Sequence, residues 1–281
     1  MNKQVARVCD LRICFGEQEI LHGVDLELTA GQRLGLLGES GSGKTLTARA
    51  LLGLLPEKAT ATGSILLHGQ EMLGAPERQW RQERGHTVGL IAQDPRTALN
   101  PLVRVGDQVA EPLRARGLGR AEAWSRAVEL LEQVKLPEAS RLARRHPGSL
   151  SGGQRQRVGI AMALAAGPDL LIADEPTSAL DVCVQAEILP LLAEISQERA
   201  LLFITHDIAV AATVCDDLVV LRHGEVVDSG PLHRVLHAPA HPYVAELLEA
   251  SRATALPTEL PTKIPQPATE PCELEPVGGL G

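Results

Sequence analysis

Aromatic residues are almost absent from this 281-residue chain, which contains two Trp, two Phe and one Tyr. A core must therefore be built from aliphatic side chains, and a nucleic-acid module that stacks bases on aromatic rings is disfavoured. No apolar run reaches the roughly 18 residues that span a bilayer, and we expect no secretory signal. Any association with a membrane is therefore expected to depend on a partner.

Cysteine and lysine are also scarce. The five cysteines are an odd number without a Cys-x-x-Cys pair, which favours a reduced, cytosolic protein. Only five of the 27 basic residues are Lys, so a Lys within a motif is informative. The formal net charge is −8, whereas a domain that neutralises a nucleic-acid backbone is usually basic. We therefore expect no nucleic-acid partner.

Hydrophobic periodicity divides the chain into alternating strands and helices, which predicts an α/β fold. Strands are predicted over residues 5–14, 24–28, 33–37, 63–74, 87–92, 169–173, 201–205, 217–221 and 225–229. Helices are predicted over residues 44–55, 107–116, 120–134, 138–145, 154–166, 182–198 and 209–215. The stretch 97–148 lacks a convincing strand and indicates a helical insertion, whereas the proline-rich residues 251–281 predict a disordered tail.

A glycine-rich loop follows the apolar strand predicted at 33–37 and opens the next helix. It fits the pattern G-x-x-x-x-G-K-[ST] of a phosphate-binding loop, or P-loop. The loop consists of Gly38, Glu39, Ser40, Gly41, Ser42, Gly43, Lys44 and Thr45. Its amides would hold a triphosphate at a helix N-terminus, Lys44 would reach the β- and γ-phosphates, and Thr45 would ligate Mg²⁺. We also expect Thr47 to contact the nucleotide.

Two adjacent carboxylates, Asp174 and Glu175, follow an uninterrupted apolar strand. Asp174 at the end of the strand is placed to hold Mg²⁺, as the acidic partner of the P-loop. Glu175 is placed to polarise a water that attacks the γ-phosphate. An isolated Asp-Glu pair would more often lie in a solvated loop, but the preceding strand and the P-loop favour the catalytic interpretation.

A second anion-binding element is predicted more than 100 residues after the first. It consists of Leu150, Ser151, Gly152, Gly153 and Gln154, directly before a helix. The chain has only one Lys of the P-loop type, so the second element would complete the nucleotide site of a neighbouring subunit. Taken alone, Ser-Gly-Gly would most often be a flexible turn.

Over about residues 5–245 the chain resembles the ATPase of ATP-binding-cassette (ABC) transporters. Further matches to this family, in chain order, are Phe15, Gln93, the segment Ser178, Ala179, Leu180 and Asp181, and His206. The resemblance implies a RecA-like P-loop NTPase core, an N-terminal antiparallel β subdomain and an inserted helical signature subdomain at about 97–165. The whole nucleotide-binding domain would span residues 1–250.

The resemblance also implies a role for each matching residue. Phe15 would stack on adenine, and Gln93 would contact Mg²⁺ and the transmembrane partner. The segment 178–181, the D-loop, would cross the dimer interface, and His206 would sense the γ-phosphate. Glu175 would act as the general base, with ATP and Mg²⁺ as the ligands.

The resemblance further implies an assembly in which two cassettes pair head to tail, each ATP lying between the P-loop of one and residues 150–154 of the other. The second cassette would be a second copy or a related chain. Two transmembrane permease subunits and, indirectly, a solute-binding protein would complete the transporter. The chain would then lie peripherally at the cytoplasmic face of the inner membrane.

Three segments resemble the importers of oligopeptides, dipeptides and nickel within this family. They are Gln93-Asp-Pro-Arg-Thr-Ala-Leu-Asn-Pro101, Leu54-Leu55-Pro56 and His241-Pro242-Tyr243. Peptide uptake is the main interpretation; uptake of nickel or a metal–metallophore complex is the alternative. A soluble ABC ATPase that acts on ribosomes or DNA is less favoured. Many members of the group carry a C-terminal cysteine cluster, whereas this chain has only Cys272 there, so we predict no iron–sulfur cluster.

Deleting residues 255–281 tests the interpretation of the tail. Because every predicted nucleotide contact lies before residue 207, we expect the shortened chain to bind ATP with the affinity of the full chain. Equilibrium titration with a fluorescent ATP analogue measures this directly. A large loss of affinity would place part of the nucleotide site in the tail.

Overall fold

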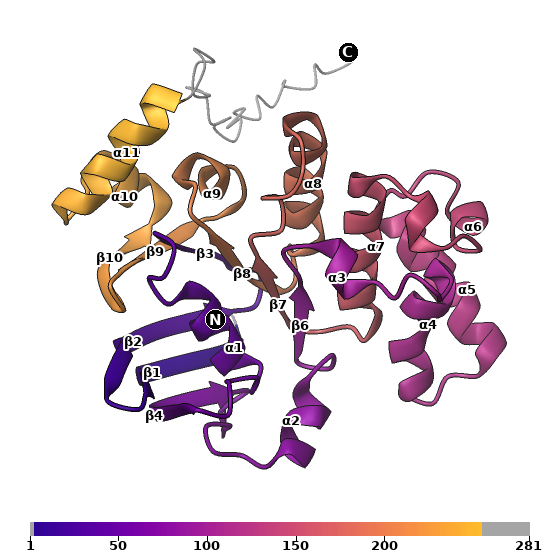
Figure 1. Cartoon of the computed structure of the whole chain (residues 1–281), viewed down its shortest axis with the longest axis horizontal. Helices are drawn as coiled ribbons and strands as arrows, with labels where there is room; N and C mark the ends of the chain where they lie inside the picture. The colour runs from indigo at the N-terminus through magenta and orange to yellow at the C-terminus, as the bar shows by residue number, and fades with distance from the viewer. Residues whose placement is uncertain (1–2, 255–281) are drawn as a thin grey trace, which may run out of the picture.

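The computed structural model of the chain describes residues 3–254, and the predicted tail at 255–281 lies outside them. Its strands and helices form two sheets, a group of helices and a C-terminal helical pair (Figure 1). Along the chain, the group of helices comes after β6 (Val88–Ile91) and before β7 (Leu170–Asp174). No helix in the described part is both long and apolar enough to cross a membrane.

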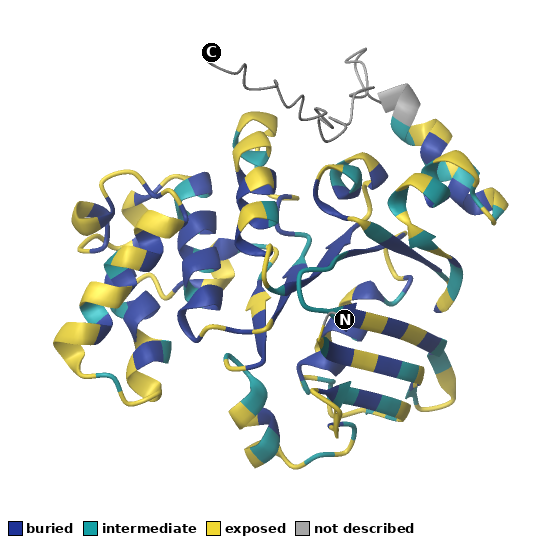
Figure 2. Cartoon of the chain, turned by 180° about the vertical axis from the view of Figure 1, so that it is seen from behind, coloured by how far each residue is buried: buried dark blue, intermediate teal, exposed yellow. Residues whose placement is uncertain are grey.

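The N-terminal sheet is antiparallel and follows the strand order β2-β1-β4-β5. Its members are β1 (Gln4–Phe15), β2 (Gln18–Thr29), β4 (Ala59–Leu67) and β5 (Gln70–Glu71). Buried and exposed residues alternate along these strands, as the banding in Figure 2 shows. This alternation is typical of a sheet with one face on the core and the other toward solvent. The buried face packs on the P-loop helix α1 (Lys44–Leu51) and on residues of the second sheet.

The second sheet has the strand order β10-β9-β3-β8-β7-β6. Besides β6 and β7 it contains β3 (Arg33–Gly38), β8 (Ala200–Thr205), β9 (Asp217–Arg222) and β10 (Glu225–Pro231). All neighbours pair in parallel except β10, which turns back on β9 through His223 and Gly224. Every residue of β8 is buried, as in a sheet covered on both faces. The loops after β3, β6, β7 and β8 therefore meet at one edge.

A helical subdomain fills the interval between β6 and β7. It contains α3 (Pro95–Ala98), α4 (Val105–Ala115), α5 (Arg120–Gln133), α6 (Ala139–Leu142), the 3₁₀ turn at Pro147–Ser149 and α7 (Gly152–Ala165). Residues 92–169, all of which the structure describes, contain no strand, as the sequence predicts. Buried aliphatic residues of α4, α5 and α7 join one core with residues of the second sheet.

Several boundaries differ from the predictions. Helix α1 ends at Leu51 rather than residue 55, because Gly53 turns the chain with φ 61°. Helix α6 is only four residues long, and the short helices α2 (Glu77–Glu83) and α10 (Leu232–His237) were not predicted. Helix α11 (Pro242–Thr254) continues four residues into the predicted tail. The remaining helices are α8 (Val182–Ile195) and α9 (Ile208–Val214).

Replacing Gly53 with Ala tests the turn that ends α1. A Cβ at Gly53 would lie 2.2 Å from the Trp80 ring, whereas a Cβ at Gly16, which has φ 62°, would meet nothing within 4 Å. We expect Gly16→Ala to lower the free energy of unfolding by about 1 kcal/mol, the usual cost of a left-handed backbone. Gly53→Ala carries the same cost plus overpacking, about 2–4 kcal/mol in total. Urea unfolding measures both, and equal losses would rule out the steric effect.

Candidate functional site

The P-loop lies between β3 and α1, where the sequence predicts it, and turns tightly around the N-terminus of the helix. Gly43 caps α1 in the left-handed region at φ 104°. A Cβ there would lie 2.2 Å from Leu21 of β2, so the loop also needs Gly43 for its close approach to the N-terminal sheet. The amides at this helix start are positioned to receive anionic oxygens.

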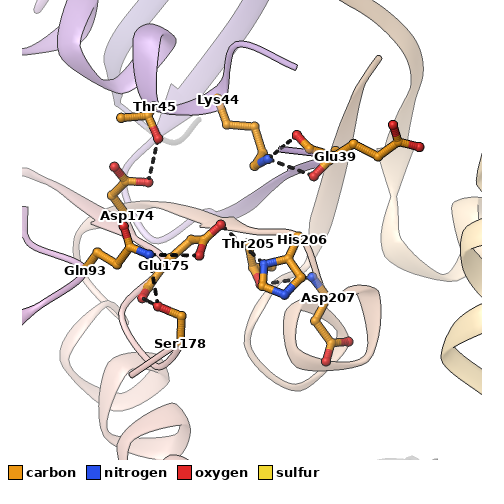
Figure 3. A network of polar contacts seen from close by, with 11 residues as sticks. Glu39, Lys44, Thr45, Gln93, Asp174, Glu175, Ser178, Thr205, His206 and Asp207 are labelled. Carbon is orange, nitrogen blue, oxygen red and sulfur yellow. Dashed lines mark hydrogen bonds and ion pairs between the residues drawn. The ribbon is translucent and has the colours of Figure 1, made fainter. Parts of the chain in front are cut away.

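Lys44 is buried inside the loop that precedes it. Its Nζ donates to the carbonyl oxygens of Gly38 at 2.7 Å and Glu39 at 2.8 Å (Figure 3). Burial lowers the pKa of Lys44, and the carboxylates of Glu175, Asp174 and Glu39 offset this only in part. A bound triphosphate would supply the anionic oxygens that favour the charged ammonium. The geometry is therefore suited to phosphate binding.

Thr45 and Asp174 face each other across the gap between α1 and β7. The Thr45 hydroxyl donates to Asp174 Oδ1 at 3.3 Å (Figure 3). Burial of Asp174 raises the pKa of its carboxyl group, a change that the hydrogen bond from Thr45 opposes. A hydroxyl and a carboxylate are the hard oxygen ligands that Mg²⁺ uses together with phosphates and water. No group of three acidic, His or Cys side chains that could hold a metal occurs in the described residues.

Glu175 is the centre of a small polar network. Its carboxylate lies 3.3 Å from both Gln93 Nε2 and His206 Nδ1 (Figure 3). Gln93 also donates to Ser178 Oγ at 3.3 Å, and that hydroxyl donates to the Glu175 carbonyl at 3.1 Å. The structure therefore brings together the residues that follow β6, β7 and β8. These are the positions that the sequence assigns to catalysis and γ-phosphate sensing.

The backbone of Glu175 is left-handed, with φ 45°, which is unusual for a residue with a side chain. Its amide donates to Ile204 of β8 at 3.0 Å, and Ser178 holds its carbonyl. These bonds stabilise a conformation that costs roughly 1–3 kcal/mol and is typical of active sites. The bend turns the carboxylate away from the strand and toward His206.

A cavity of about 480 Å³ opens beside these groups. Its lining includes the P-loop residues Ser40, Gly41, Gly43, Lys44 and Thr45, together with Gln93 and Glu175. Ile20 of β2 and Arg49 of α1 also line it, and the sequence analysis missed both. Arg49 stands one helical turn after Thr45, a signal that could have indicated it. The position of Ile20 depends on how the N-terminal sheet packs, for which no local signal exists.

The second predicted anion-binding element begins helix α7 and lies apart from this cavity. Ser151 accepts from the Gln154 amide at 3.2 Å and Gln154 Oε1 accepts from the Ser151 amide at 3.0 Å, which is a capping box. Gly153 packs against Val184 of α8. Ser151 is exposed, Leu150 is buried, and none of residues 150–154 lines the cavity beside the P-loop.

The D-loop residues lie directly before α8. Asp181 caps this helix by accepting from the Val184 amide at 3.0 Å, and Leu180 lies 3.8 Å from the Cβ position of Gly152. Ser178 and Ala179 are exposed. The D-loop thus connects the Glu175 network at one end with the start of α7 at the other.

Two residues that we expect to contact the nucleotide, Thr47 and Phe15, do not line this cavity. Thr47 is fully buried and its hydroxyl donates to the Gly43 carbonyl at 3.0 Å, so it supports the loop from within. Its contact with the nucleotide stays a prediction. Phe15 lies half-buried at the end of β1 and is not among the residues that line the cavity. Its stacking on adenine stays a prediction.

Comparison with known proteins agrees with this geometry. The family model described as ABC transporter matches residues 21–178, more than half of the chain. The chain belongs to the ABC transporter family. It is 45% identical to an oligopeptide transport ATP-binding protein of Salmonella typhimurium over 250 residues. The aligned residues cover 86% of this chain and 75% of that protein. A dipeptide transport ATP-binding protein of Lactococcus lactis is 41% identical over 258 residues, or 88% and 74% of the two chains.

Solved structures show the same cassette fold. A dimeric bacterial ABC transporter cassette superposes with a TM-score of 0.71 at 30% identity, over 81% of this chain and 98% of that one. A dimeric post-hydrolysis state of an ATP-binding cassette, bound to ADP and Pi, gives a TM-score of 0.70 at 30% identity and the same coverage. The predicted fold class is confirmed, and this ABC chain is an ATP-binding ATPase.

Replacing Lys44 with Ala tests the phosphate-binding loop. Because the change removes charged hydrogen bonds worth about 1.5–3 kcal/mol, we expect ATP affinity to fall by about 10–150-fold. Lys58→Ala is the matched control, since Lys58 is exposed and does not line the cavity. Fluorescence titration with ATP measures affinity, and thermal unfolding checks that each variant is folded. Near-normal ATP binding by folded Lys44→Ala would contradict the assignment.

Proposed function

We propose that this ABC ATPase is the ATP-hydrolysing subunit of a bacterial importer that takes up oligopeptides or dipeptides. The relatives named above are peptide-transport subunits, which favours peptides over nickel or a metal–metallophore complex as cargo. The same relatives disfavour a soluble ATPase that acts on ribosomes or DNA. The cargo itself would be recognised by the permeases and a solute-binding protein rather than by this chain.

One observation carries the proposal: the two phosphate-binding elements of the chain do not share a cavity. The P-loop lines one, whereas Ser151 is exposed at the start of α7 and lines no part of that cavity. A helix start that presents an exposed Ser151 is useful if a second cassette brings its own ATP to it. The solved neighbours with this fold are dimeric, which supports a head-to-tail pair. Each ATP would then lie between one P-loop and the partner's residues 150–154.

Phosphate binding is the first task of this site. The amides at the start of α1 and the Lys44 ammonium take up the β- and γ-phosphates, which replace the Gly38 and Glu39 carbonyls as partners of Nζ. Thr45, Asp174 and Gln93 are the residues that would hold Mg²⁺, whose chemistry is to neutralise charge on the phosphates. Phe15 would contact the adenine from the end of β1.

Hydrolysis requires a positioned water, and Glu175 is placed to orient it. Its carboxylate is held between Gln93 and His206, both at 3.3 Å. The His206 side chain is largely exposed, which leaves it room to turn toward a γ-phosphate. Positioning and charge stabilisation supply most of the catalysis in phosphoryl transfer. Closure of the ATPase dimer would drive the permeases, and hydrolysis would reset them.

Glu175→Gln tests both the role of Glu175 as the general base and the place of this chain in an importer. The variant keeps the shape of the site but loses the base, so we expect ATP binding with turnover lowered by roughly 10²–10⁴-fold and a closed dimer that accumulates. Affinity capture of the tagged full chain from detergent-solubilised native membranes, with ATP, should recover two permeases and a second cassette. Mass spectrometry identifies them, and a co-recovered binding protein indicates the cargo.

The control is Glu57→Gln, which changes an exposed carboxylate outside the site and should keep normal turnover. Wild-type turnover by Glu175→Gln would remove Glu175 from the role of base. Recovery of ribosomal or DNA-bound proteins without a permease would overturn the importer assignment in favour of a soluble ATPase. Capture with the control variant shows which proteins depend on the closed state.

A further inference from the structure

The helical subdomain contains a second cavity, of about 540 Å³, between α4, α5 and the segment after α6. It shares no lining residue with the cavity at the P-loop, and Figure 1 shows these helices on the side of the molecule away from α1. Its polar and aromatic lining consists of Arg104, Asp107, Arg114, Arg120, Trp124 and Arg144. This size suits a single small molecule.

The cavity is strongly cationic in a chain whose net charge is −8. Four arginines and a single carboxylate line it, and none of the four arginines forms an ion pair within residues 3–254. On other faces of the same subdomain arginines are paired, as in Arg126 with Glu129 and Arg141 with Glu138. All four arginines are exposed, so water and salt screen part of their mutual repulsion, and an anion between them would remove more of it.

Backbone bonds fix the elements that carry these arginines. The amides of Val105 and Gly106, at the start of α4, donate to the carbonyls of Arg145 and Ala143 at 2.9 and 2.8 Å. These bonds place Arg144 beside the start of α4. Planar guanidinium groups presented from several elements are the usual means of gripping phosphate.

Trp124 supplies an aromatic wall beside the cations. The edge of its ring packs so closely on Gly106 that a Cβ there would lie 2.7 Å from the indole. Trp124 is half-buried, lines the cavity, and makes no hydrogen bond within the described part of the chain. An aromatic ring next to phosphate-binding arginines offers one surface for a base and another for its phosphates.

We propose that this cavity binds a nucleotide as a second ligand, apart from the ATP that is hydrolysed. The phosphates lie among the four arginines, and the base contacts Trp124. The Asp107 carboxylate accepts a hydrogen bond from a hydroxyl or amino group of the nucleoside. A ligand here bridges α4, α5 and the segment that leads to Ser151, so its binding is transmitted to residues 150–154 at the start of α7.

The test counts ADP sites on the full chain by isothermal titration calorimetry. We expect two ADP sites per chain in the wild type, the P-loop site weakened in Lys44→Ala, the second site weakened in Arg120→Gln/Arg144→Gln, and both weakened in the triple variant. Losing two charged contacts should weaken the second site by at least roughly tenfold. The matched control is Arg126→Gln on α5, an arginine that is outside the cavity and paired with Glu129. It should keep both sites.

Trp124→Leu separates the base contact from the phosphate contact. In the Lys44→Ala background it should weaken ADP binding several-fold and leave the binding of inorganic pyrophosphate unchanged. Equal weakening of both probes would mean that the ring only supports the fold. Circular dichroism confirms that each variant is folded.

Two outcomes would overturn the proposal and leave the ATPase assignment intact. One is a single ADP per wild-type chain, whose binding Lys44→Ala weakens and Arg120→Gln/Arg144→Gln leaves unchanged. The other is binding to phosphatidylglycerol vesicles that depends on Arg120 and Arg144 without a second ADP, which would make the ligand a lipid headgroup. If the wild-type chain binds no ADP at the P-loop site, that result would instead contradict the proposed function.

Discussion

The parallel pairing of β3, β8, β7 and β6 is the constraint on which the site depends. Because these strands run in one direction, their carboxyl ends meet at one edge of the sheet. The P-loop, Gln93, Glu175 and His206 follow four different strands, yet the register brings Gln93 and His206 to Glu175, and Thr45 of the P-loop to Asp174. Moving any of these strands by one residue would turn its last side chain away from the others.

Electrostatics at this edge make the site receptive to ATP. Lys44 is buried on carbonyl oxygens and has a lowered pKa, and Asp174 has a raised one, so both groups lack full charge compensation. The strained backbone of Glu175 is held by the same sheet. The energy of packing thus maintains a polar arrangement that a triphosphate completes.

Residues 150–154 are positioned by the helical subdomain rather than by the edge of the parallel sheet. Ser151 caps α7 within the helical subdomain, and the D-loop connects α7 with the Glu175 network. In the proposed head-to-tail pair, one chain would therefore supply the P-loop to one ATP and residues 150–154 to the other. The same subdomain also places the cationic cavity close to the segment before Ser151, so a ligand there and a partner cassette would act on one structural unit.

Local sequence by itself determined the P-loop, the apolar strands that end at Gly38 and Asp174, the capped start of α7 and the helical insertion. Each depends on short-range chemistry: apolar runs, glycine turns and caps. Tertiary structure alone decided that Ile20 lines the ATP cavity, that Thr47 faces inward, and that Arg120 and Arg144 share a hollow. The direction of a side chain depends on which distant element packs beside it, and periodicity does not contain that information.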